Sequence, residues 1–93
     1  MGDYTNLKIS ALELRSAMPT LLALLHEGET YVGNLYPKVS PSASVMHERI
    51  GDLLALDLIE EWREERPPRR RFVRLTEKGL VVASLLQKVE EAL

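Results

Sequence analysis

The sequence predicts one small α+β domain that is mainly helical, in the order helix, short helix, helix, hairpin, helix. Apolar residues recur at three- and four-residue spacing before residue 57 and again after residue 76, as on one face of a helix. Between these stretches, residues 58–65 have the two-residue period of a short strand, and residues 71–75 form a second short extended run. A length of 93 residues suits a single domain, 1–93.

The first helix has two candidate starts. Ser10 and Glu13 match a capping box, in which each side chain satisfies a free amide of the first turn, so a helix is expected just after Ser10. Pro19 disfavours helix at the residue before it and lacks an amide donor. This leaves either a kink near Met18 or a second helix that starts at Ser16.

A short second helix is expected after a brief connection. Gly28 is a suitable C-terminal cap for the first helix, because glycine adopts left-handed backbone easily. Thr30 is then the expected N-cap of a helix over residues 31–37, which Pro37 should end.

The third helix is expected from Pro41 to about Leu56. Ser40 supplies a hydroxyl cap, and Pro41 suits the first helical position, where its missing amide costs nothing. The buried face should consist of Met46, Ile50, Leu53 and Leu54. The outward face should then carry Ser44, Val45, Glu48, Arg49 and Asp52.

The hairpin and the last helix complete the order. Pro67 and Pro68 belong in the hairpin turn, since proline cannot donate to a strand ladder. Thr76 can cap the final helix. The apolar stripe of that helix consists of Val82, Leu85, Leu86, Val89 and Leu93. It is larger than the rest of a small domain can cover, so a second copy of the chain is expected to pack on it.

Positive charge is concentrated in the hairpin. Residues 63–74 contain six arginines and two glutamates, a formal charge of +4, in a chain whose net charge is −2. Phosphate backbones bind where cations cluster, so this segment favours a nucleic-acid partner over a solvated hairpin tip.

The pattern resembles that of winged helix-turn-helix regulators of the MarR-like and PadR-like kinds. The resemblance runs over about residues 19–92, through Val45, Leu53, Leu58 and Ile59, the charged hairpin, and the sequence Leu-Thr-Glu-Lys-Gly at 75–79. It is also similar to the short winged-helix proteins of hyperthermophilic archaea and their viruses. The resemblance implies a helix-turn-helix at about 19–57, a two-stranded wing at about 58–75 and a dimerisation helix at about 77–92.

Double-stranded DNA and a second copy of the chain are the partners that the resemblance implies. In that family the third helix enters the major groove, the wing reaches phosphates or a minor groove, and terminal helices form a two-fold dimer. Transferred to this chain, the third helix supplies Ser42, Ser44, Val45, His47 and Arg49 as base-reading candidates. The wing supplies Arg66, Arg69, Arg70 and Arg71, and Thr30 and Tyr31 are candidate phosphate contacts.

Two features depart from the family pattern or complicate it. Asp57 stands where the family often has glycine before the first wing strand, and aspartate tolerates the left-handed backbone expected there. Glu48 and Asp52 on the third helix repel phosphate unless they pair with cations such as Arg49 or accept from cytosine. His47 has a second reading as a boundary residue, and Tyr31 as a core residue.

Other functional classes find little support. The chain has no cysteine, and His26 and His47 are its only histidines, so no metal, catalytic or cofactor site is expected. No stretch approaches the roughly 20 apolar residues of a membrane span, so a cytoplasmic protein is expected, in the host cell if it is viral. Short terminal segments leave little room for a small-molecule effector, and none is expected.

Three alternatives to a sequence-specific regulator stay open. A winged helix can act as a protein-interaction module in a transcription or replication assembly, and the acidic residues of the third helix favour this reading. The protein can also be an architectural DNA binder without sequence preference. Double-stranded RNA is a third candidate, although its deep, narrow major groove suits a helix poorly.

Overall fold

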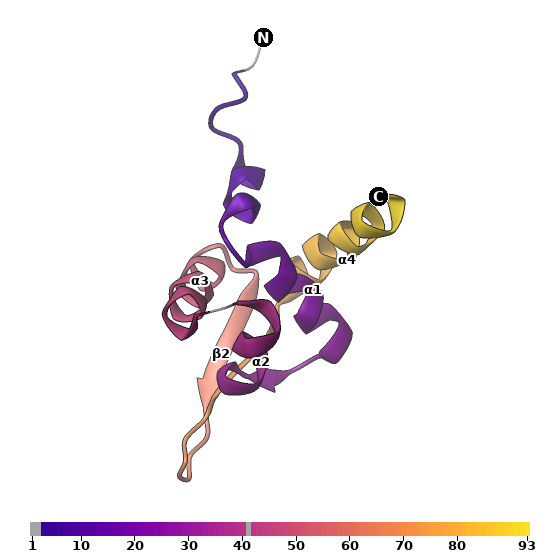
Figure 1. Cartoon of the computed structure of the whole chain (residues 1–93). Helices are drawn as coiled ribbons and strands as arrows, with labels where there is room; N and C mark the ends of the chain where they lie inside the picture. Colours follow the sequence, from indigo (N-terminus) through magenta and orange to yellow (C-terminus); the bar gives the residue numbers. More distant parts are fainter. Residues whose placement is uncertain (1–2, 41) are drawn as a thin grey trace.

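The computed structural model describes residues 3–40 and 42–93 and contains five helical segments and a small sheet (Figure 1). The wing, defined here as the hairpin of residues 59–75, projects from the helical body at the end opposite the N-terminal segment. The elements are η1 (Lys8–Glu13), α1 (Ala17–Glu27), β1 (Thr30–Tyr31), α2 (Val32–Val39), α3 (Ala43–Ala55), β2 (Ile59–Arg63), β3 (Arg71–Leu75) and α4 (Glu77–Ala92).

The sheet has three antiparallel strands in the order β1-β3-β2, one more than the sequence predicts. Strand β1 is only two residues long, and Thr30 pairs with Val73 of β3. Two residues are too few to show a period, so the pattern cannot reveal this strand. It fastens the start of α2 to the base of the wing.

One hydrophobic core lies where α1, α2, α3 and α4 meet the sheet. Its members come from every one of these elements, so the small domain buries a single continuous cluster. They are Leu21, Leu24, Val32, Leu35, Met46, Ile50, Leu53, Leu58, Ile59, Val73 and Ala83. The predicted inward positions 46, 50 and 53 of the third helix are confirmed.

The capping box predicted at Ser10 is wrong. Residues 8–13 form a 3-10 helix, and Ser10 lies inside it instead of capping an α-helix. The alternative start is confirmed, because α1 begins at Ala17 directly after Ser16, which has a left-handed φ of 69°. Pro19 then lies in the first turn, where amides have no helical partner. Gly28 ends α1 as predicted, with φ 75° and its amide bonded to Leu24.

Two of the predicted N-caps are wrong. Thr30 lies in β1, and its hydroxyl accepts a hydrogen bond from the side chain of Asn34 at 2.8 Å. The cap of α3 is Ser42, whose hydroxyl accepts from the amide of Val45, and Ser40 instead ends α2. Pro41 lies outside the described residues. Pro37 does not end α2, which continues to residue 39.

The base of the wing is tied to α4 by a compact set of hydrogen bonds. Asp57 has the predicted left-handed backbone, with φ 58°. Thr76 caps α4 as predicted, because its hydroxyl accepts from the amide of Gly79 at 2.9 Å. The same hydroxyl donates to the carbonyl of Asp57 at 2.6 Å, and the Thr76 amide donates to the carbonyl of Leu58 at 3.1 Å. The turn before the wing is therefore held against the first turn of α4.

Candidate nucleic-acid interface

The exposed face of α3 is rotated relative to the face that the sequence predicts. Ser44, His47, Glu48 and Gly51 are exposed, and their spacing of three and four residues places them on one side of the helix. Val45 is only half-buried and lies beside this stripe. Of the five candidates on α3, Ser44 and His47 are therefore the ones the structure presents to solvent.

Arg49 is buried, so its predicted outward position is wrong. Its exposed fraction is 6%, and its side chain lies against the junction between η1 and α1. Its Nε donates to the carbonyl of Arg15 at 2.6 Å, and one terminal nitrogen donates to Asp52 at 2.5 Å. These bonds satisfy a buried guanidinium and anchor the N-terminal segment to α3. They also neutralise Asp52, one of the two acids that argued against DNA.

The N-terminal turn of α3 is closed by its own serines. The Ser42 hydroxyl caps the helix and lies 2.9 Å from the hydroxyl of Ser44. The Ser40 hydroxyl donates to the carbonyl of Ser42 at 3.0 Å. Ser42 is therefore occupied in shaping the turn, while the exposed Ser44 keeps further hydrogen-bonding capacity at the end of the helix.

The wing carries less net positive charge than the sequence window suggests. Its residues 59–75 hold six arginines and four glutamates, a formal charge of +2, because β2 contributes two glutamates beyond that window. Strand pairing brings these acids next to the arginines of β3, with Glu60 opposite Arg74. Hairpin register, which the sequence pattern leaves open, thus decides which arginines lie beside a glutamate.

Three wing arginines form ion pairs with glutamates of the opposite side of the hairpin. Arg70 bonds Glu64 at 2.5 Å and Arg74 bonds Glu60 at 2.5 Å. The third pair is Arg71 with Glu61. The glutamate hydrogen bonds raise the pKa of Arg70 and of Arg74 above their ordinary value. These guanidinium groups stay charged, but each one lies beside a compensating carboxylate.

The other three wing arginines lie toward the tip. Arg63, Arg66 and Arg69 are exposed, and within residues 3–40 and 42–93 none of them has a carboxylate within 4 Å. Arg63 donates to the carbonyl of Arg69 at 3.3 Å, and the amide of Arg69 bonds the carbonyl of Arg66 at 3.0 Å, so backbone contacts gather all three. Pro67 and Pro68 occupy the turn between them, as predicted.

An aromatic row crosses the face of the sheet at the wing base. The Phe72 ring stacks on Trp62 at a centroid distance of 5.6 Å and meets Tyr31 edge-on at 5.8 Å. Arg70 lies 4.9 Å above the Tyr31 ring, and Arg74 lies 5.0 Å above Trp62. The row braces the three strands against one another.

The two predicted phosphate contacts at the start of α2 differ in access. Thr30 is buried, and its hydroxyl accepts a hydrogen bond from the side chain of Asn34. Tyr31 is half-buried within the aromatic row. Both residues therefore connect β1 to its surroundings.

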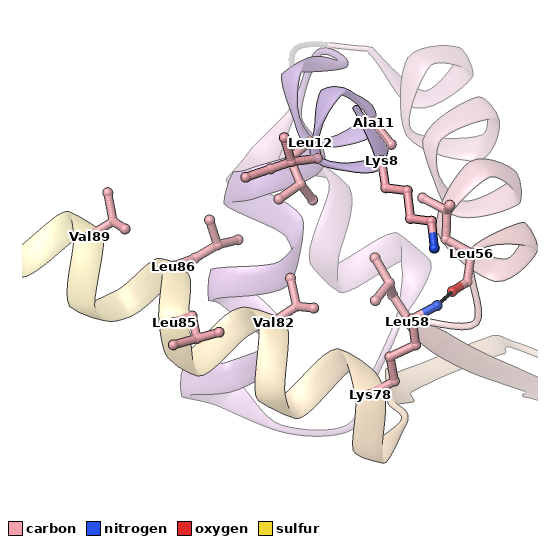
Figure 2. A pocket seen from close by; sticks show the side chains of 11 residues that line it. Lys8, Ala11, Leu12, Leu56, Leu58, Lys78, Val82, Leu85, Leu86 and Val89 are labelled. Carbon is pink, nitrogen blue, oxygen red and sulfur yellow. Dashed lines mark hydrogen bonds between the residues drawn. The ribbon is translucent and has the colours of Figure 1, made fainter. Parts of the chain in front are cut away.

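A hydrophobic groove of about 420 Å³ lies between η1, the end of α3 and α4 (Figure 2). Val82 and Leu86 line the groove and also pack against the core. These two residues of the predicted dimer stripe are therefore partly covered by their own chain. Lys78 crosses one end and donates to the carbonyl of Leu56 at 2.8 Å. The expectation that the chain leaves little room for a cavity is wrong, because the 3-10 segment and α4 form opposite walls. The prediction of no effector loses that support.

Part of the terminal stripe is open to solvent. Leu85 is 56% exposed, Val89 54% and Leu93 98%, and Val81, which is absent from the predicted stripe, is 60% exposed. Residues 81, 85, 89 and 93 recur every four residues and so lie along one side of α4. This exposed apolar row is the part of α4 that a partner could cover.

Among residues 3–40 and 42–93, no three histidine or acidic side chains lie together as a metal site would require. In the same part of the chain, no helix has the length and apolar character needed to cross a membrane.

Known structures share this fold, although no protein-family model and no curated protein matches the sequence. A transcriptional regulator homologue from Pyrococcus horikoshii OT3 matches with a TM-score of 0.78 and 15% identity, covering 91% of this chain and 85% of that chain. NMB1585, a MarR family regulator from Neisseria meningitidis, matches with a TM-score of 0.74 and 25% identity over 90% of this chain. FabT from Streptococcus pneumoniae, solved in complex with DNA, has a TM-score of 0.73 and 16% identity over 98% of this chain.

The fold is that of winged-helix regulators, and the chain resembles the MarR family. It spans 60% of the NMB1585 chain and 59% of the FabT chain.

Proposed function

We propose that the protein is an intracellular DNA-binding transcription regulator that acts as a homodimer and has no catalytic activity. Helix α3 enters the major groove of double-stranded DNA, and the wing tip contacts phosphates at the edge of a neighbouring minor groove. The observation that carries this proposal is the placement of Arg63, Arg66 and Arg69 toward the tip of a wing that projects from the helical body, with no carboxylate of a described residue within 4 Å (Figure 1).

The proposal assigns the phosphate contacts to the wing arginines that have no glutamate partner among the described residues. If Arg70 bound a phosphate in place of Glu64, the unpaired Glu64 carboxylate would stay next to the DNA. Its repulsion of the phosphate would offset the attraction gained by Arg70. Arg63, Arg66 and Arg69 form no ion pair with a described residue, so none is broken when they bind a phosphate. The proposed contacts therefore keep Arg66 and Arg69 from the sequence prediction, add Arg63, and set aside Arg70 and Arg71.

The homodimer is proposed to form through the exposed stripe of α4. A second α4 that packs on Val81, Leu85 and Val89 would bury surface that the monomer leaves in water. A two-fold dimer presents two α3 helices to one face of DNA, about 34–36 Å apart, and so prefers an inverted repeat.

Salt dependence of DNA binding tests the phosphate contacts. Fluorescence anisotropy on a duplex pool between ~50 and ~200 mM salt gives the slope of log K against log salt, which becomes shallower by about 0.9 for each phosphate that the protein no longer neutralises. Arg69→Gln should make the slope shallower and weaken binding to all sequences alike. The matched control, Arg70→Gln combined with Glu64→Gln, leaves the net charge of the wing unchanged and should leave the slope near the parent value.

Sequencing of the retained duplexes separates the candidate functions. An enriched inverted repeat supports the regulator, whereas salt-sensitive binding without enrichment indicates an architectural DNA binder. Preference for an RNA duplex over DNA would replace DNA by RNA as the partner.

A protein-interaction module is the second candidate, and one observation favours it. Glu48 is exposed in the middle of the α3 stripe, and the described residues offer it no cation within 4 Å. A carboxylate at this place repels phosphate unless it accepts from a cytosine amine. Absence of DNA binding at both salt concentrations would favour this candidate.

A further inference from the structure

His47 of α3 is connected to the wing through Arg71. One terminal nitrogen of Arg71 lies 3.2 Å from Nδ1 of His47, and the Nε of Arg71 donates to Glu61 of β2. The three side chains thus link α3, β3 and β2. The Arg71 side chain is 19% exposed, so this guanidinium is packed between its partners rather than extended into solvent.

The contact with Arg71 fixes the hydrogen-bonding role of His47. A guanidinium carries only N–H donors, so the ring nitrogen it meets must accept, which requires Nδ1 to be without a proton. In the neutral ring the proton then resides on Nε2. Glu61 holds the guanidinium from the other side, so its direction toward the ring is also set.

The free nitrogen of His47 lies on the exposed face of α3. His47 is exposed and shares the outward stripe with Ser44 and Gly51. Because Nδ1 is occupied by Arg71, Nε2 points away from the wing arginine, as the two ring nitrogens face different directions. A single N–H donor of fixed tautomer is thereby presented where a helix reads the major groove.

We propose that His47 is a specificity-determining residue that donates from Nε2 to a base acceptor in the major groove, with Arg71 and Glu61 as its positioning residues. The acceptor it selects is guanine N7 or O6, because guanine offers two acceptors and no donor on that edge. This inference rests on the proposed DNA-binding function. It assigns Arg71 a different task from the phosphate-binding arginines of the wing tip.

The tautomer can be measured without DNA. In alkaline solution, where imidazole rings are neutral, two-bond ¹H–¹⁵N correlation spectra distinguish a proton on Nε2 from one on Nδ1. The parent should show His47 with its proton on Nε2, and Arg71→Gln combined with Glu61→Gln should give a mixture of both tautomers. A parent ring protonated on Nδ1, or a double variant with an unchanged spectrum, would overturn the inference.

Base preference tests the recognition step. Duplex selection on the parent should show a guanine preference at one position of each half-site. His47→Ala and the Arg71, Glu61 double variant should both reduce this preference, on the order of tenfold when one base hydrogen bond is removed, whereas His47→Gln, which keeps a donor near Nε2, should retain part of it. The melting temperature of each variant should stay near the parent value.

The control is a second neutral pair on the same hairpin. Arg70→Gln with Glu64→Gln removes an equivalent ion pair that does not contact α3, and it should leave the preference unchanged. An equal loss in both pairs would indicate general loosening of the wing and would overturn the positioning role of Arg71. If the parent binds no nucleic acid at all, the proposed function fails, and the tautomer measurement still decides the Arg71 contact.

Discussion

Replacing Gly79 with alanine should destabilise the protein, although alanine is the better helix former. Gly79 lies in the first turn of α4 against the wing base, and a Cβ built there would meet the carbonyl oxygen of Leu58 at 1.8 Å. Real Cβ atoms essentially never approach closer than 3.0 Å, so the backbone of α4 or of residue 58 must move by about 1.2 Å. The atom in the way is backbone, and it also accepts the amide hydrogen bond of Thr76.

The expected cost follows from these contacts. Overpacking of a core costs about 1–3 kcal/mol, and loss of the Thr76 cap or its amide bond adds about 1 kcal/mol. The helix preference of alanine returns about 0.5–1 kcal/mol. Gly79→Ala should therefore lower the free energy of unfolding by about 1–3.5 kcal/mol, which corresponds to a fall in melting temperature of roughly 4–8 °C per kcal/mol for a domain of this size.

Gly51 provides the matched control. It is also a helical glycine, but the space around its built Cβ is open within 4 Å, so Gly51→Ala should raise stability by up to about 1 kcal/mol. Both variants are compared by urea denaturation, and Gly79→Ala is also made in the Gly51→Ala background in case the single variant does not fold. The reasoning is refuted if Gly79→Ala is as stable as the parent.

Three further changes test other parts of the structure. Arg49→Met should lower the free energy of unfolding by about 1–3 kcal/mol, because the Arg15 carbonyl and the Asp52 carboxylate lose their hydrogen-bond donor. An unchanged denaturation midpoint would contradict the role of these hydrogen bonds. Val89→Glu should convert a dimer to a folded monomer in light scattering, while the neighbouring Lys88→Glu should not; a persistent dimer moves the interface elsewhere. Ser42→Ala should cost about 1 kcal/mol because the helix cap is removed, and no change in melting would argue against that cap.

Local chemistry made several elements predictable. Gly28, Asp57 and Thr76 each act on their own backbone or on an amide three or four residues away, and the structure confirms the role predicted for each. The order of helices and hairpin follows from apolar periods that extend over many residues. The resemblance to winged-helix regulators depends on this order and is likewise confirmed.

The wrongly predicted helix starts show that the rule for helix caps can fit several nearby residues. Ser10, Ser40 and Ser42 all satisfy the sequence rule for a helix cap, and only Ser42 caps an α-helix. Each has a suitable hydroxyl, so the rule cannot rank them. For Ser40 and Ser42, the start of α3 must also place Met46 and Ile50 of that helix in the core, which the cap rule does not consider.

The candidate interface was harder to predict than the fold. Arg49 lies beside the inward stripe of α3, and its burial depends on a carbonyl 34 residues away in the chain. Three of the wing arginines lie beside Glu60, Glu61 and Glu64, which compensate their charge, and these pairs depend on how the two sides of the hairpin are aligned. Neither effect has a signal in the spacing of residues along the sequence.

By itself, the sequence determined the order of the helices and the hairpin, where α1 ends, and that arginines gather in one hairpin, because these properties depend on neighbours a few residues apart. The tertiary structure decided which arginines are open and which are paired, turned Arg49 inward, and placed His47 against Arg71. These are contacts between side chains from different elements, so they exist only once packing and strand register bring those elements together.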